Sequence, residues 1–74
     1  MSEDRVNSPS YYVMPNGAET VSITQWLTSA GAQAVQYIVR STRIDGVVKE
    51  NQIEDLEKAA FWLAVEIKRL REAA

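Results

Sequence analysis

The sequence predicts a small all-α protein with two short helices followed by one long C-terminal helix, a small domain that assembles as an oligomer. No Gly or Pro interrupts the chain from Asn51 to Ala74, and apolar residues recur there at helical spacing. A second observation is the length of 74 residues. A chain this short buries only about 60% of the surface that its unfolded form exposes, so it often needs association for stability.

Residues 1–10 are polar apart from Met1, Val6 and Pro9, and we predict a flexible N-terminal arm there. Burial of so few apolar groups cannot offset the entropy lost on ordering. Residues 11–74 are predicted to form a single helical domain. Its first segment, Tyr11 to Met14, is expected to be extended.

A turn is expected at Pro15-Asn16-Gly17, because proline fixes one dihedral and Asn-Gly readily adopts positive φ. The first helix is expected to begin at Ser22, where Ser22 to Gln25 has capping-box spacing. Its apolar face would consist of Ile23, Trp26 and Leu27. The Ser-Ala-Gly segment 29–31 is expected to separate it from the second helix.

The second helix is predicted over residues 32–41, with Val35, Ile38 and Val39 on one side. Its polar face presents amides, a phenol and a guanidinium, at Gln33, Gln36, Tyr37 and Arg40. This face is either simply solvated or a surface for a polar ligand or another subunit. The absence of Lys and Glu favours the second interpretation.

The loop between Thr42 and Glu50 has a turn signal at Asp45-Gly46. Arg40, Arg43 and Lys49 converge on it, and such cations can bind phosphate. The GxxxxGK[ST] pattern of a nucleoside triphosphate loop is absent from the sequence.

The third helix is expected to start with a capping box at Asn51 to Glu54. A heptad seam follows, made of Ile53, Leu56, Ala60, Leu63, Ile67, Leu70 and Ala74. Phe61, Trp62 and Val65 lie outside this seam, so the apolar surface exceeds what the two short helices can cover. We therefore predict self-association through the third helix, as a dimer or a ring of dimers.

Composition excludes several classes of function. The chain has no Cys and no His, which argues against structural zinc and Cys-His or Ser-His nucleophiles. With 8 basic and 10 acidic residues it lacks the field that general nucleic-acid binding requires. No apolar run approaches the roughly 20 residues of a membrane span, so a cytoplasmic protein without membrane attachment is expected.

Three segments, Ser8 to Tyr12, Val35 to Arg40 and Ile53 to Leu63, resemble a short bacteriophage protein family of unknown function. A related domain forms the C-terminal part of a coliphage kinase that phosphorylates deoxynucleoside monophosphates. The resemblance covers about residues 8–70 and implies a phage-encoded protein that acts in the cytoplasm of the host bacterium.

The family pattern is P-x-H-Y, then N-x-x-K-Y-x-x-R, a basic G-K-K loop and E-D-L-x-K-A-x-x-Y-L. Tyr11, Gln33 and Gln36 stand where the family has His, Asn and Lys, and Ser-Thr-Arg at 41–43 replaces most of the basic loop. The residues that match by position are Pro9, Tyr12, Tyr37, Arg40, Asp55 and Lys58. Because an imidazole and an ammonium group are missing, the resemblance favours binding over phosphoryl transfer.

Three hypotheses follow. The first is an oligomeric module that binds a small phosphorylated ligand, a nucleotide or cyclic nucleotide, and so sequesters a host defence signal. The second is a nucleotide-metabolism enzyme of the deoxynucleoside monophosphate kinase type. Only this hypothesis calls for a cofactor, Mg²⁺ held by Asp55 or another carboxylate. The third is a helical interaction module whose third helix docks on a host protein.

For the first hypothesis we place the ligand site among Tyr12, Gln36, Tyr37, Arg40, Arg43 and Lys58, with no catalytic residue and no metal ligand. Arg40 would hold the phosphate through its guanidinium fork. The alternative for Arg40 is a structural ion pair with Asp55 or Glu54 across the helix interface.

Overall fold

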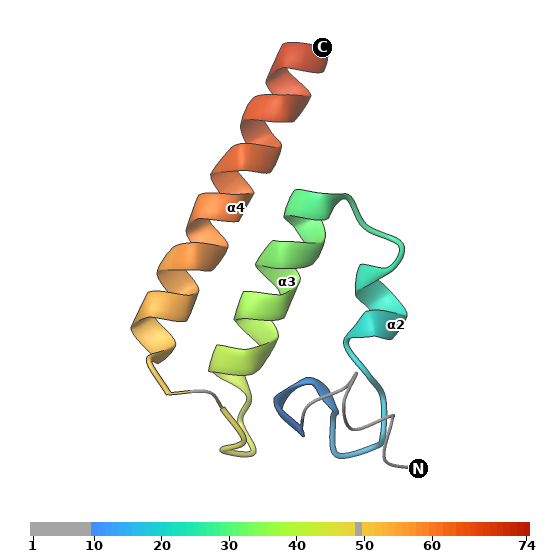
Figure 1. Ribbon diagram of the computed structural model, residues 1–74, viewed down its shortest axis with the longest axis vertical. Coiled ribbons are helices and arrows are strands. Elements are labelled where there is room, and N and C mark those ends of the chain that lie inside the picture. Colours follow the sequence, from blue (N-terminus) through green and yellow to red (C-terminus); the bar gives the residue numbers. More distant parts are fainter. Residues whose placement is uncertain (1–9, 49) are drawn as a thin grey trace.

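The computed structural model describes residues 10–48 and 50–74, so residues 1–9 of the predicted arm (residues 1–10) and Lys49 lie outside the described residues. Its elements are the 3-10 turn η1 (Ser10–Tyr12) and the helices α2 (Val21–Thr24), α3 (Ser29–Thr42) and α4 (Gln52–Ala73). Figure 1 shows that α4 runs antiparallel to α3 and extends well beyond it, while α2 lies on the other side of α3. The helical fold class with a long C-terminal helix is confirmed, and no strand occurs among the described residues.

The segment before α2 folds back on itself. Tyr11 and Tyr12 belong to η1, so the extended conformation predicted for them is wrong. The turn lies where it was predicted, because Gly17 adopts a φ of 88° and its N–H donates to the Met14 carbonyl at 2.8 Å. The reversal brings Thr20 to Tyr12, whose carbonyl accepts from both the N–H and the hydroxyl of Thr20 at 3.0 Å.

The boundary between α2 and α3 differs from the prediction. Helix α2 begins at Val21, without a side-chain cap, and α3 begins at Ser29 rather than at residue 32. Thr28 caps α3, since its Oγ1 accepts from the Gly31 N–H at 3.1 Å. A Cβ at Gly31 would stand 3.0 Å from that oxygen. The glycine therefore makes room for the cap instead of breaking the helix.

Helix α4 starts at Gln52, close to the prediction, but the capping box does not form. Asn51 takes a left-handed conformation with φ 69° and ψ 50°, and its side chain makes no capping hydrogen bond. The Gln52 amide Nε2 instead donates to the Ser41 carbonyl near the end of α3, at 2.8 Å. This bond satisfies one of the carbonyls that the end of α3 leaves without a helical partner.

The most buried residues of α3 and α4 have small side chains or, in Asp55, a paired one. Ala34, Ser41 and Ala59 are only 2%, 2% and 3% exposed, and Ala30 is also buried. Small residues let two helices approach closely, but they remove little apolar surface from water. The buried apolar residues in the described part of the chain are all alanines.

The predicted heptad seam of α4 faces away from α3. Its large members are exposed as follows: Ile53 76%, Leu56 41%, Leu63 48%, Ile67 48% and Leu70 53%. The α3-facing side of α4 instead carries Asp55, Ala59 and the half-buried Trp62. Trp26 on the loop after α2 is 81% exposed. None of the helices in the described ranges combines the length and apolar character that a bilayer crossing requires.

Candidate functional site

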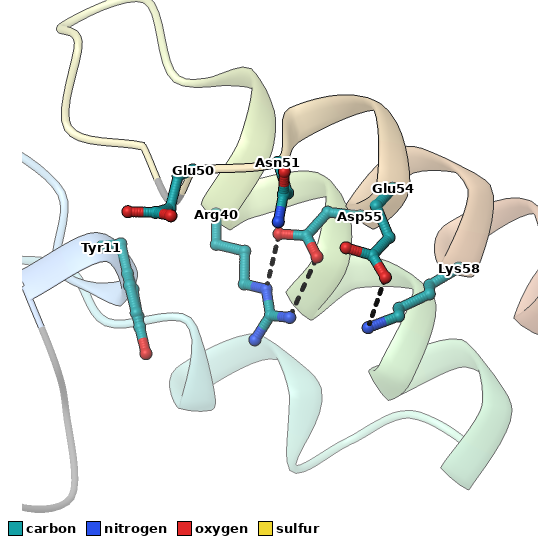
Figure 2. Close-up of a pocket in the computed structure, with 7 residues that line it drawn as sticks. All are labelled: Tyr11, Arg40, Glu50, Asn51, Glu54, Asp55 and Lys58. Atoms are coloured by element: carbon teal, nitrogen blue, oxygen red, sulfur yellow. Dashed lines mark hydrogen bonds and ion pairs between the residues drawn. The ribbon is translucent and has the colours of Figure 1, made fainter.

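A cleft of about 530 Å³ opens where the start of α4 meets η1 and the last turns of α3 (Figure 2). Seven described residues line it: Tyr11, Arg40, Glu50, Asn51, Glu54, Asp55 and Lys58. Its polar floor comes from α3 and α4, while Tyr11 supplies an aromatic wall.

An ion pair between Arg40 and Asp55 forms the floor of the cleft. Arg40 donates from Nε to Asp55 Oδ2 at 2.9 Å and from Nη2 to Oδ1 at 3.0 Å, as the dashed lines in Figure 2 mark. The Asp55 side chain is 4% exposed and that of Arg40 is 17% exposed. The hydrogen bond with Asp55 raises the pKa of Arg40, and burial opposes that rise.

Two tyrosines complete the surroundings of the guanidinium. Arg40 Nη1 donates to the Tyr12 hydroxyl at 3.3 Å, and its central carbon lies 4.5 Å from the centroid of the Tyr37 ring. Asp55 therefore occupies one edge of the fork and Tyr12 lies at another. This is the structural role that the sequence left open for Arg40, and it leaves little of the fork for a phosphate.

Lys58 lies beside the same cluster. Its Nζ is 3.9 Å from Glu54 Oε2 and 5.7 Å from the centroid of the Tyr37 ring. A pair of this length with half-exposed side chains is weakly held. Lys58 can turn toward the cleft at little cost. Tyr12, Tyr37, Arg40 and Lys58, four of the six predicted site residues, thus lie together.

Arg43 performs a different task. Its guanidinium binds both carboxylate oxygens of Asp45, and its Nη1 donates to the Val13 carbonyl at 2.7 Å. The hydrogen bond from Arg43 lowers the pKa of Asp45. These bonds fix the turn after α3 against the segment that precedes α2. Of the six predicted site residues, only Arg40 and Lys58 line the cleft itself.

Sequence reasoning missed Tyr11, Glu50, Asn51 and Glu54 as residues of the cleft. Acidic residues are common near the start of a helix, where they interact favourably with the helix dipole. Glu54 was therefore not recognised as a residue of the cleft. With them the lining holds three carboxylates against two cations. The cleft is therefore mixed in charge rather than a basic pocket.

The carboxylate expected to hold magnesium already has a partner in the cleft. Asp55, the expected magnesium ligand of the enzyme hypothesis, binds Arg40 through both oxygens. Among the described residues there is no group of three or more carboxylate, His or Cys side chains placed to hold a metal ion.

Comparison with protein families, curated proteins and solved structures finds no match for this chain. The resemblance to a phage family stays a prediction, and the function has to be inferred from the residues themselves.

Proposed function

We propose that this protein is a helical interaction module that works as a homo-oligomer, assembled through the exposed seam of α4. The main observation in support of the proposal is that small apolar residues are buried while large apolar residues are exposed. Alanines form the buried core, while Leu63, Ile67 and Leu70 stand about half exposed along one face of α4. Contiguous exposed apolar surface of this kind marks interaction sites.

The free energy gained by burying the seam is comparable to the free energy that association costs. Covering the exposed half of one such side chain contributes about 1 kcal/mol, and a symmetric dimer counts each of the five large seam residues twice. A sum near 10 kcal/mol falls within the roughly 4 to 15 kcal/mol that association costs in lost freedom. The seam can therefore bring two copies together, and contacts at its edges must set how tightly they bind.

Apolar side chains outside α4 also favour an interaction protein. Val21, Ile23 and Trp26 are exposed on and just after α2, away from the α4 seam. An oligomer would present several copies of this surface to another macromolecule, as the host-protein hypothesis requires. Multiple copies raise the effective affinity for a repeated or oligomeric target.

Sedimentation of two matched variants tests the assembly. Leu63→Glu places a charge in the seam and should yield a folded monomer. Ile44→Glu changes a fully exposed apolar residue on the loop after α3 and should leave the oligomer intact. Circular dichroism confirms that each variant is helical. A wild-type chain that sediments as a monomer, or an oligomer that survives Leu63→Glu, rejects the proposal.

The cleft supports a second candidate function, the binding of a small phosphorylated ligand. Its volume of about 530 Å³ lies within the range of roughly 300 to 1,000 Å³ that small-molecule sites occupy. The weakly held Lys58 is the cation best able to meet a phosphate, and Tyr11 offers a ring on which a base could stack. The three carboxylates of the lining oppose this function, so we rank it second.

Calorimetry with a deoxynucleoside monophosphate and a cyclic nucleotide tests the second candidate. Lys58→Ala should weaken binding about tenfold, equivalent to about 1.4 kcal/mol. Lys68→Ala is the control, because Lys68 also pairs with a glutamate on α4 but lies far from the cleft. An absence of binding heat for the wild-type chain eliminates this candidate. Phosphoryl transfer from ATP to the monophosphate would instead revive the kinase hypothesis.

A further inference from the structure

Nearly every charged side chain of α4 has a partner within the chain. The ion pairs are Arg40 with Asp55, Glu54 with Lys58, Glu66 with Arg69, and Lys68 with Glu72. Glu57 and Arg71 are the exceptions, since their side chains make no ion pair or hydrogen bond with any other described residue. One acidic and one basic side chain of α4 thus have no partner among the described residues.

The two exceptions occupy the same edge of the seam. With Ile53, Ala60 and Ile67 at heptad position a, both Glu57 and Arg71 fall at position e. Ala64 is also at e and lies midway between them. Side chains at e flank the apolar seam and are placed to form ion pairs between two helices.

The other edge of the seam is already covered. Ala59 and Glu66 occupy position g; Ala59 is buried against α3, and Glu66 accepts hydrogen bonds from Arg69 at 2.6 and 3.2 Å. The e edge lies about half a turn around α4 from the side that faces α3. It is the edge that remains for contact with another helix.

We infer that two copies of the chain join along this seam with their α4 helices antiparallel, on a two-fold axis beside Ala64. This inference rests on the proposed self-association and specifies its geometry. In an antiparallel pair, e positions of one helix face e positions of the other. Glu57 and Arg71 lie seven residues to either side of Ala64, so each Glu57 meets the partner's Arg71, and each Arg71 meets the partner's Glu57.

A parallel pair leaves the same charges without partners. There, e positions face g positions, so Glu57 would face Gln52 and Arg71 would face Glu66, which Arg69 already holds. The shape of the surface also fits the antiparallel arrangement. A depression borders the e edge, where the small Ala64 side chains let the helices approach at the axis; its lining consists of Ala64, Ile67, Lys68, Arg71 and Glu72.

A charge exchange tests the orientation. Each single variant, Glu57→Arg or Arg71→Glu, creates two like-charge contacts in the antiparallel dimer and should raise the dissociation constant about tenfold, equivalent to about 1.4 kcal/mol. The double variant Glu57→Arg/Arg71→Glu restores both pairs and should recover wild-type affinity. Ile44→Glu, which adds a charge at a fully exposed position on the loop after α3, is the control and should leave the affinity unchanged. A double variant as weak as the singles overturns the inference.

Distances between spin labels give a second, independent measurement. The natural chain has no Cys, so a single cysteine can be placed and labelled at will. Labels at Ala74→Cys should lie about 30 Å apart in the antiparallel dimer, from the rise of 1.5 Å per residue over ten residues on each side of Ala64. A parallel dimer would place them about 10 Å apart, and that result overturns the orientation. Because Leu63→Glu tests self-association separately, failure of the orientation is distinguishable from failure of the proposed function.

Discussion

The guanidinium of Arg40 binds the carboxylate of Asp55 through two parallel hydrogen bonds of 2.9 and 3.0 Å, which tie the end of α3 to the first turn of α4. The other most buried residues of the two helices include Ala34, Ser41 and Ala59, whose small side chains offer few features to fix how the helices align. A bidentate ion pair has one favourable geometry. We therefore assign to Arg40 and Asp55 the alignment of α3 on α4.

Removal of the buried carboxylate should be severely destabilising. Asp55→Ala leaves the largely buried Arg40 charge uncompensated, and breaking a buried pair in this way costs about 3 to 5 kcal/mol. Urea denaturation measures the loss. Glu54→Ala is the matched control, because its pair with Lys58 spans 3.9 Å between half-exposed side chains and should contribute less than about 1 kcal/mol. Equal losses for the two variants would show that Asp55 has no special role.

The close contact of α3 and α4 gives a second prediction. Ala34 is 2% exposed, so Ala34→Leu forces added side-chain volume into a filled space and should cost about 1 to 3 kcal/mol. Ala73→Leu adds the same atoms at the exposed end of α4 and should change the free energy of unfolding by less than about 0.5 kcal/mol. The thermal unfolding midpoint of each variant measures the effect. If Ala34→Leu kept the wild-type midpoint, the helices could move apart to fit the larger side chain without loss of stability.

The spacing of apolar residues predicted that the helices exist, but it did not predict which of their faces pack together. Heptad spacing correctly indicates that Leu56, Leu63 and Leu70 share a face, but spacing does not say which element covers that face. Helix α3 packs against the side of α4 that carries Asp55 and Ala59, because an alanine permits close approach and the carboxylate binds Arg40. The start of α3 was missed for a related reason, since a glycine in a first turn looks like a helix break.

Part of the residue cluster around Arg40 could be predicted from the sequence. Tyr37 and Arg40 are three residues apart in a helix, and Lys58 is three residues after Asp55, so both pairs could be placed on a common face. Arg43 could not be placed in this way, because its carboxylate partner Asp45 comes from the turn that follows the helix. Glu50 and Asn51 line the cleft through a loop conformation that periodicity does not describe.

Glu66 should make stability depend on pH in the acid range. Hydrogen bonds from Arg69 and then from the Thr28 side chain lower the pKa of Glu66 below its ordinary value of 4.5. A carboxyl whose folded pKa is depressed contributes stability above its unfolded pKa, and this is lost as the pH falls through the folded pKa. Wild type should thus be more stable than Glu66→Gln above about pH 4.5, and the difference should vanish in stronger acid.

Nuclear magnetic resonance titration of Glu66 and denaturation across this pH range provide the measurements. Arg69→Ala removes the main cause of the shift and should return the pKa of Glu66 toward 4.5. A stability difference between wild type and Glu66→Gln that stays constant from neutral to strongly acid pH would contradict the assignment.

The last prediction concerns the backbone at the start of α4. Asn51 has φ 69° and ψ 50°, a left-handed conformation that costs most residues about 1 to 2 kcal/mol but that asparagine and glycine tolerate. Its side chain makes no capping hydrogen bond, so replacement should act through the backbone alone. Asn51→Ala should therefore lose about 1 kcal/mol in the free energy of unfolding, while Asn51→Gly should remain close to wild type. Urea denaturation of both variants separates the backbone effect from loss of the amide. Neither variant has a side chain that could replace the amide. Equal destabilisation by both would therefore mean that Asn51 stabilises the start of α4 through its side chain rather than through its left-handed backbone.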